Sequence, residues 1–243
     1  MLSRHRRGTT CAAASIAALL LVSSALAARP SPTLPAQIPA HEREKLQEIA
    51  DGASVSARAT GEPFLARPDV FEFLLDHPEF ATHVTRALKL GRYRIWHDAE
   101  GRLWLDDGWG VVGQFSVVYA SSGTRVVFAH GQYQSGLLPS IGGQAVVVIE
   151  YSLSPMADRR SLVSSTVTGF VRLDSKIVAL ASMLAGSVAT AKAEKEAKSF
   201  VRLFARVSRA IEDNPARVRD VVGQRPDVPA ADLEEFRRLQ DLR

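Results

Sequence analysis

The sequence predicts an α+β fold in which a curved antiparallel β-sheet wraps around a long C-terminal α-helix, with short helices before the sheet. Two observations predict this fold. Residues 93–173 are a succession of strand-like segments and turns, with no helical segment between the strands, which argues against a doubly wound parallel sheet. Residues 174–211 then form the longest helical pattern in the chain, and nothing strand-like follows it.

The N-terminus has the pattern of a secretory signal peptide. Basic residues at positions 4–7 precede a small and apolar run over 12–26, and Ala25-Leu26-Ala27 is an A-x-A cleavage pattern. We therefore expect residues 1–27 to be a signal peptide cleaved after Ala27; the alternative is that it is retained as an N-terminal anchor. Residues 28–40, rich in Pro and Ala, are interpreted as a flexible linker.

Removal of the signal peptide changes what composition implies. The single cysteine, Cys11, leaves with it, so the mature chain must be stable without disulfides even in an oxidising compartment. The mature chain keeps 27 Lys and Arg against 26 Asp and Glu, so it lacks the excess of positive charge that is typical of proteins that bind nucleic acid. We expect a periplasmic or secreted monomer that does not bind nucleic acid.

Each element of the predicted domain, residues 41–213, has a local signal. Before the sheet, a short amphipathic helix is expected over 41–50, a weak strand over 53–60, and two helices over 69–75 and 78–90 that are delimited by Pro78 and Gly91. The sheet is expected from six strand-like segments: 93–97, 103–105, 111–119, 125–133, 144–153 and 161–173. A Gly-containing loop is expected over 134–143.

The long helical pattern carries two apolar stripes that point to nearly opposite sides at about 100° per residue. One straight helix could not bury both, so a short helix over 175–185 and a long helix beginning near Gly186 are expected. The short helix is interpreted as a movable flap or membrane-touching edge, or else as buried against residues 69–90. The long helix has small residues first and large ones later, so its small end would leave space above a curved sheet.

The last residues, 214–243, are predicted to be a polar C-terminal extension that ends in a charged amphipathic helix over 229–242. Its position at the terminus favours packing back on the domain or fraying, and a role in binding a partner is the alternative.

This element order resembles that of the START-like, or SRPBCC (Bet v 1-like), helix-grip superfamily over residues 54–212. The segments behind the resemblance are SVSARAT (54–60), VFEFLLDHPEFATHV (70–84) and KAEKEAKSFVRLFARVSRAI (192–211). The resemblance implies a hydrophobic ligand held between the sheet and the last helix, and some members are cyclases or hydrolases. An export signal and the extra helix over 175–185 are departures from the familiar members.

Catalytic and metal-binding motifs are not found. His77, Glu79 and His83 do not form H-E-x-x-H, and Pro78 separates His77 from the helix face. Asp98, Glu100 and their neighbours are typical turn acids. The sequence contains no G-x-S-x-G elbow, P-loop or dinucleotide fingerprint. We predict no catalytic residue, no metal and no cofactor.

The prediction is therefore an exported protein that binds a lipid or other hydrophobic small molecule, with possible peripheral contact to a membrane. The residues expected to line the ligand site are Trp109, Phe115, Phe128, Tyr133, Ala189, Ala193 and Ala197. Two alternatives stay open: an enzyme on the same scaffold, which would need a His, Asp or Glu facing inward, and a cell-envelope interaction protein with a solid core.

Overall fold

The computed structural model describes residues 32–135, 138–174 and 186–241. The chain divides into two units, Met1–Pro30 and Ser31–Arg243, and the described residues all belong to the second. The predicted signal peptide and the predicted helix over 175–185 lie outside the described residues. Within those three ranges, no helix has the length and hydropathy needed to span a membrane.

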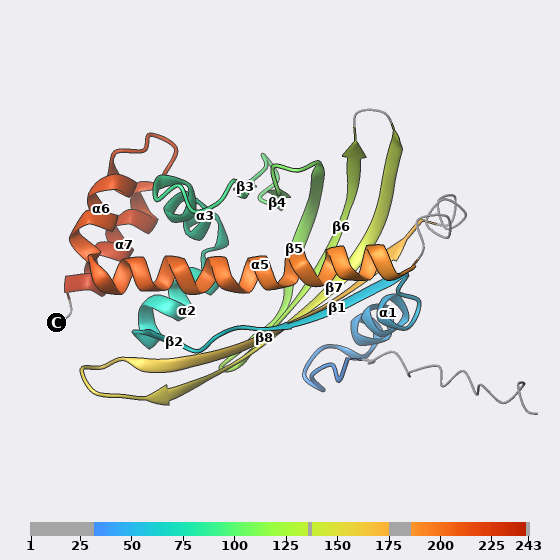
Figure 1. Ribbon diagram of the computed structural model, residues 1–243, viewed down its shortest axis with the longest axis horizontal. Coiled ribbons are helices and arrows are strands. Elements are labelled where there is room, and N and C mark those ends of the chain that lie inside the picture. The colour runs from blue at the N-terminus through green and yellow to red at the C-terminus, as the bar shows by residue number, and fades with distance from the viewer. Residues whose placement is uncertain (1–31, 136–137, 175–185, 242–243) are drawn as a thin grey trace, which may run out of the picture. The chain divides into compact units, whose positions relative to one another are not determined.

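The α+β class is confirmed: the second unit contains one open, antiparallel sheet of eight strands, flanked by helices (Figure 1). The strand order is β1-β8-β7-β6-β5-β4-β3, and β2 also pairs with β8. The strands are β1 (Val55–Thr60), β2 (Phe64–Ala66), β3 (Arg94–His97), β4 (Leu103–Asp106), β5 (Val111–Ser121), β6 (Thr124–Ser135), β7 (Leu138–Pro155) and β8 (Ser161–Leu173). The predicted loop over 134–143 is wrong, because β7 begins at Leu138 and pairs with Ser135 across the hairpin.

Six helices lie among the described residues: α1 (Ala40–Asp51), α2 (Pro68–Asp76), α3 (Pro78–Ala87), α5 (Gly186–Asp213), α6 (Pro215–Gly223) and α7 (Ala230–Asp241). Proline begins α2, α3 and α6, where its missing N–H costs no intrahelical bond. The predicted start of the long helix at Gly186 is confirmed. Helix α6 and strand β2 were not predicted, since each is short: nine and three residues.

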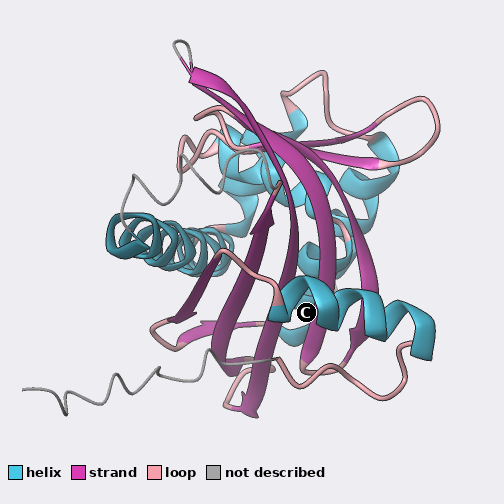
Figure 2. Cartoon of the chain, turned by 90° about the vertical axis from the view of Figure 1, so that its right-hand side faces the viewer, coloured by secondary structure: helices cyan, strands magenta, loops and turns pink. Residues whose placement is uncertain are grey.

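The sheet has two apolar faces, and each is covered by a different part of the chain (Figure 2). The α1 face carries Val126, Val146 and Val148, against which α1 buries Leu46 and Ile49. Residues Leu34 and Ile38 of the predicted flexible linker are buried in the same cluster. The chain is therefore fixed to the sheet before α1 begins, because these two side chains are removed from water there.

The opposite side, the α5 face, carries Ala59 and Val167, on which α5 packs through Val201. Helix α5 lies mainly over β1, β2 and β8 at one edge of the sheet. Gly61, between β1 and β2, makes this close approach possible, because a Cβ atom there would collide with the side chain of Val201. The axis of α5 crosses the strand direction, and its C-terminal end reaches α6, near the tip of the β7–β8 hairpin (Figure 1).

The C-terminal half of α5 also joins α2, α3, α6 and α7 in a second core. Phe73, Phe80 and Phe236 form its aromatic centre, with ring centroids 5.1–6.2 Å apart. Ile211 of α5 and Val222 of α6 are buried beside them. The predicted C-terminal extension thus packs back on the domain, because Val222 and Phe236 supply apolar surface that α2 and α3 cover.

The buried guanidinium of Arg125 connects helix α2 to the sheet. Its Nη2 atom donates to Glu72 Oε2 at 2.7 Å and to Asp76 Oδ1 at 2.9 Å, both on α2. Its Nη1 atom donates to the hydroxyl of Tyr151 at 3.0 Å, and that hydroxyl donates to Glu72 Oε1 at 2.7 Å. A buried cation with this many partners fixes the position of α2 over the end of β6 and β7.

Replacing Arg125 by Met tests this connection. The substitution removes the cation and its hydrogen bonds to Glu72, Asp76 and Tyr151. Because the two carboxylates remain partly solvated, we expect the free energy of unfolding to fall by about 1.5–3 kcal/mol. Arg58→Met is the matched control, because Arg58 and Glu150 form a solvent-exposed pair 3.8 Å apart that should contribute less than about 1 kcal/mol. Urea denaturation of both variants measures the difference; equal losses would show that Arg125 does not fix α2.

Candidate functional site

A patch without large side chains occupies the α5 face of the three central strands. Gly113 of β5, Gly131 of β6 and Gly143 of β7 are neighbours across the sheet, and Ala129 and Ala145 form the next row. A Cβ atom on Gly113 or Gly131 would lie less than 3 Å from the partner's backbone, so the close strands require glycine there. We call these five residues the small-residue patch.

Larger apolar side chains surround the small-residue patch. Phe115 pairs with Ala129 in register and with Leu103 of β4, and Leu105 pairs with Gly113. Val117 continues the same face along β5 and is 40% exposed. These side chains are only partly covered because α5 lies mainly over the other edge of the sheet.

The N-terminal half of α5 carries the small residues predicted for the ligand site. Ala197 packs beside Val201 against Ala59 and Val167, and Ala193 is half-buried one turn earlier. Ala189 lies on the same helix, and the surroundings of its side chain are not described. Ala197 therefore contacts β1 and β8 and does not lie over an empty space.

The large residues of α5 follow, as the sequence predicted. Phe200 is 39% exposed, and its ring lies 6.5 Å from that of Phe204. The ring of Phe204 in turn meets Phe71 of α2 edge-on at 5.7 Å. The aromatic series thus runs from the core under α2 to an exposed side chain at the middle of α5.

The four predicted sheet and loop residues do not form one group. Phe115 and Tyr133 lie on the α5 face, where Tyr133 pairs with Val111. Phe128 lies on the α1 face, where it packs with the cluster under α1 and Lys45 Nζ lies 4.8 Å from its ring centroid. The sheet pattern assigned Phe128 to the wrong phase, because its neighbours in β6 are apolar on both faces. Trp109 is 65% exposed in the β4–β5 turn, under the guanidinium of Arg92.

A half-buried phenol links α5 to the β4–β5 turn. Burial raises the pKa of Tyr93, and the negative charges of Glu196 on α5 and Asp107 in the turn raise it further. The phenol is therefore neutral at physiological pH and can donate a hydrogen bond. Tyr93 is thus a hydrogen-bond donor near Glu196 of α5 and Asp107 of the turn.

The small-residue patch was the feature that the sequence reasoning missed. Gly113, Gly131 and Gly143 each interrupt or border a strand pattern, and glycine within a strand signals a bulge or a close backbone approach. That signal was present in the sequence. Their alignment across β5, β6 and β7 depends on the register of two hairpins, and the sequence pattern did not predict that register.

His77, Glu79 and His83, which lie close in sequence, each face a different partner: Asp232, His97 and Asp227, respectively. Within the described ranges, no group of three or more His, Cys, Asp or Glu side chains is arranged to hold a metal ion. His83 is buried in α3, 3.5 Å from Asp227 through Nδ1, and Arg86 lies 3.3 Å from the same carboxylate. Burial lowers the pKa of His83 despite the opposing charge of Asp227.

The lowered pKa of His83 predicts a pH-dependent stability. In the unfolded chain, His83 takes up a proton near pH 6.5. In the folded protein its pKa is lower, so protonation favours the unfolded chain and stability is lost as the pH falls below about 6.5. The slope is at most roughly 1.4 kcal/mol per pH unit for one proton. We expect His83→Gln to flatten the stability profile between pH 7.5 and 5, measured by urea denaturation at each pH. The exposed control His41→Gln should keep the wild-type profile, and a wild-type slope in His83→Gln would contradict the assignment.

Comparison with protein-family models and with curated proteins gives no match. Among solved structures, the chain is similar to hypothetical protein jhp0584 from Helicobacter pylori, with 12% sequence identity and a TM-score of 0.36, over 63% of this chain and 86% of that one. It is also similar to a conserved protein from Geobacillus kaustophilus, with 16% identity and a TM-score of 0.36, over 65% of this chain and 93% of that one. Similarity at this level does not assign a function.

Proposed function

We propose that this chain is an exported, helix-grip-like protein that binds a lipid or other hydrophobic small molecule between the sheet and the N-terminal half of α5. The observation that carries the proposal is the small-residue patch. Five adjacent positions with no side chain beyond Cβ lie among half-buried apolar side chains, on the face that α5 covers at one edge. An apolar molecule resting there would remove both the patch and its apolar surroundings from water.

The chemistry of the surroundings favours binding over catalysis. The buried cation of the α5 face, Arg125, is engaged by Glu72 and Asp76 of α2 and by the hydroxyl of Tyr151. Such satisfied groups are held in place and have little capacity to act on a substrate. Tyr93 offers one hydrogen bond to the polar end of a bound molecule, which suits a lipid-like ligand with one oxygen-bearing group.

Export to the periplasm or the cell exterior is the second part of the proposal, and its support is the sequence. The basic residues at 4–7, the apolar run over 12–26 and Ala25-Leu26-Ala27 form a signal-peptide pattern. The intact mass of protein recovered from the envelope fraction should correspond to a chain beginning at Ala28. Recovery of the full-length chain from the cytosol would exclude this part of the proposal.

Filling the small-residue patch should abolish binding. Ala129→Phe places a ring over the patch, and since Ala129 is half-buried in a strand, the larger side chain should cost little stability. His130→Phe is the matched control, because His130 is the adjacent residue, is exposed and faces the opposite side of the sheet. Titration with the neutral apolar dye Nile red should give binding at least tenfold weaker for Ala129→Phe and unchanged for His130→Phe.

Either of two results would refute the site. A wild-type protein that does not enhance Nile red fluorescence has no accessible apolar site. A dye that binds Ala129→Phe and wild type equally must bind elsewhere. Thermal melts of the variants establish that the fold is retained in each titration.

The two halves of α5 should respond differently to substitution. Ala193→Phe adds bulk to the half-buried side of the N-terminal half of α5, where the proposed ligand would lie, so we expect it to weaken dye binding while the melting temperature changes little. Phe204→Ala removes a ring that contacts Phe71 and Phe200, and we expect the free energy of unfolding to fall by about 3–5 kcal/mol. If Ala193→Phe instead destabilises the fold by about 1–3 kcal/mol, as overpacking does, the helix and sheet are in full contact there.

A further inference from the structure

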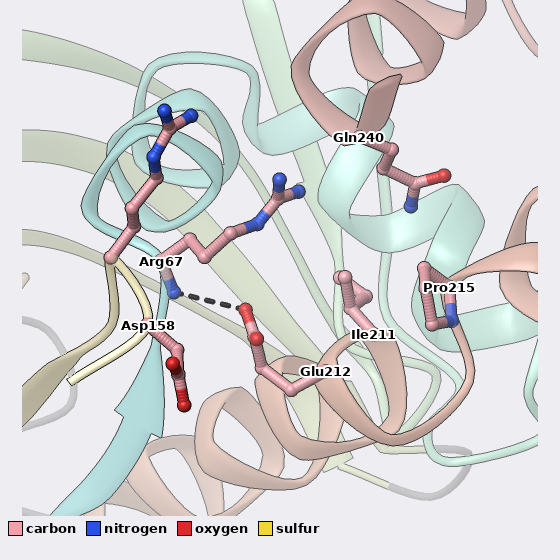
Figure 3. A pocket seen from close by; sticks show the side chains of 7 residues that line it. Arg67, Asp158, Ile211, Glu212, Pro215 and Gln240 are labelled. Atoms are coloured by element: carbon pink, nitrogen blue, oxygen red, sulfur yellow. Dashed lines mark hydrogen bonds between the residues drawn. The ribbon is translucent and has the colours of Figure 1, made fainter. Parts of the chain in front are cut away.

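A polar cavity of about 370 Å³ lies at the far end of α5 from the small-residue patch (Figure 3). The β7–β8 hairpin, the residue before α2, the end of α5, the start of α6 and the last turn of α7 meet there. The residues that line it are Arg67, Asp158, Arg159, Ile211, Glu212, Pro215 and Gln240. Its volume is in the range of sites for small molecules.

The amide of Gln240 is the first indication of a ligand. Gln240 is 4% exposed, and neither its Nε2 nor its Oε1 atom makes a hydrogen bond within the described part of the chain. Buried amides in folded proteins almost always have partners, because an unpaired polar group keeps the cost of leaving water. An occupant of the cavity that Gln240 lines would supply the missing acceptor and donor.

Arg67 is the second indication, because its side chain is held in place with most of its donors unused. Its backbone N–H donates to Glu212 Oε1 at 2.9 Å, the bond drawn in Figure 3, and its Nη1 donates to the carbonyl of Leu239 at 2.8 Å. No carboxylate of the described ranges forms an ion pair with this guanidinium. A guanidinium offers five N–H donors in a planar fork that matches a carboxylate.

Charges of both signs line the cavity. Arg67 presents a guanidinium from the residue before α2, and Glu212 presents a carboxylate from the end of α5, while Asp158 pairs with Arg160 at 3.4 Å. The carboxylate of Glu212 would repel a phosphate or another multiply charged anion. The cavity suits a small molecule that itself carries one charge of each sign, and Ile211 and Pro215 offer that molecule an apolar wall.

We propose that this cavity binds a small zwitterion of the amino-acid type, either a free amino acid or a short peptide. The ligand's carboxylate accepts from Arg67, its ammonium donates to Glu212, and Gln240 pairs with a further polar group of the ligand. The site shares no residue with the small-residue patch, so either proposal can fail without the other.

The test uses the mature chain and a panel of the twenty proteinogenic L-amino acids together with glycylglycine. We expect at least one member to raise the melting temperature and to give a dissociation constant by calorimetry. Tighter binding of glycylglycine would identify the ligand as a short peptide, and tighter binding of a single amino acid would identify it as a free amino acid. N-acetylation and C-amidation of the best member should each weaken binding at least tenfold, because each removes one charge of the zwitterion.

Two variants separate the site from the fold. Gln240→Met removes the unpaired amide but keeps the length of the side chain, so binding should weaken at least tenfold while the unliganded protein melts no lower than wild type. Gln224→Met changes an exposed glutamine at the end of α6 and should change neither property. Arg67→Gln should weaken binding at least tenfold as well.

Several results would overturn the proposal. The proposal fails if no member of the panel binds, or if the acetylated ligand binds as tightly as the free one. It also fails if Gln240→Met binds the ligand as tightly as wild type. Sodium phosphate binding in place of every amino acid would identify the cavity as an anion site, and this would equally exclude a zwitterion.

Discussion

The structure depends on a single β-sheet with two apolar faces, both of which must be removed from water. The two helix layers come from opposite ends of the domain. Residues 34–51 cover one face, through Leu34, Ile38 and α1, and α5 covers the other from the C-terminal side of the chain. The sheet can therefore be stable only when both ends of the domain have returned to it.

The cover on the α5 face is unequal, and this inequality creates the candidate site. Gly61 allows Val201 to approach β1 and β8 closely, which fixes α5 at one edge. Arg125 fixes α2 over one end of β6 and β7 through Glu72 and Asp76. Among the described residues, no helix makes comparable contact with the remaining area of this face, around Gly113 and Gly131, where the strands carry small residues.

Helix α5 joins the two proposed sites. Its N-terminal half carries Ala193 and Ala197 beside the sheet, and its C-terminal half supplies Ile211 and Glu212 to the polar cavity. Between them, Phe200 and Phe204 connect to Phe71 of α2. The two ends differ in chemistry, because one lies against a sheet of apolar and small residues and the other meets charged loops and helix ends.

The sequence by itself determined the elements whose signals are local. Strand β8 was predicted with its observed bounds, and the start of α5 at Gly186 followed from the change of apolar stripe. The gradient from Ala193 to Phe204 also predicted which end of α5 would be firmly packed. These features follow from periodicity and turn residues, which act over a few positions along the chain.

Only the tertiary structure decided which residues meet. Phe128 lies under α1 rather than beside Phe115 because β6 has apolar residues on both faces, so its alternation could not assign a side. The row of Gly113, Gly131 and Gly143 exists only through the register of two hairpins. Arg67 reaches the carbonyl of Leu239 across 172 positions of sequence. Such contacts depend on how distant elements pack, and no local pattern of residues encodes that packing.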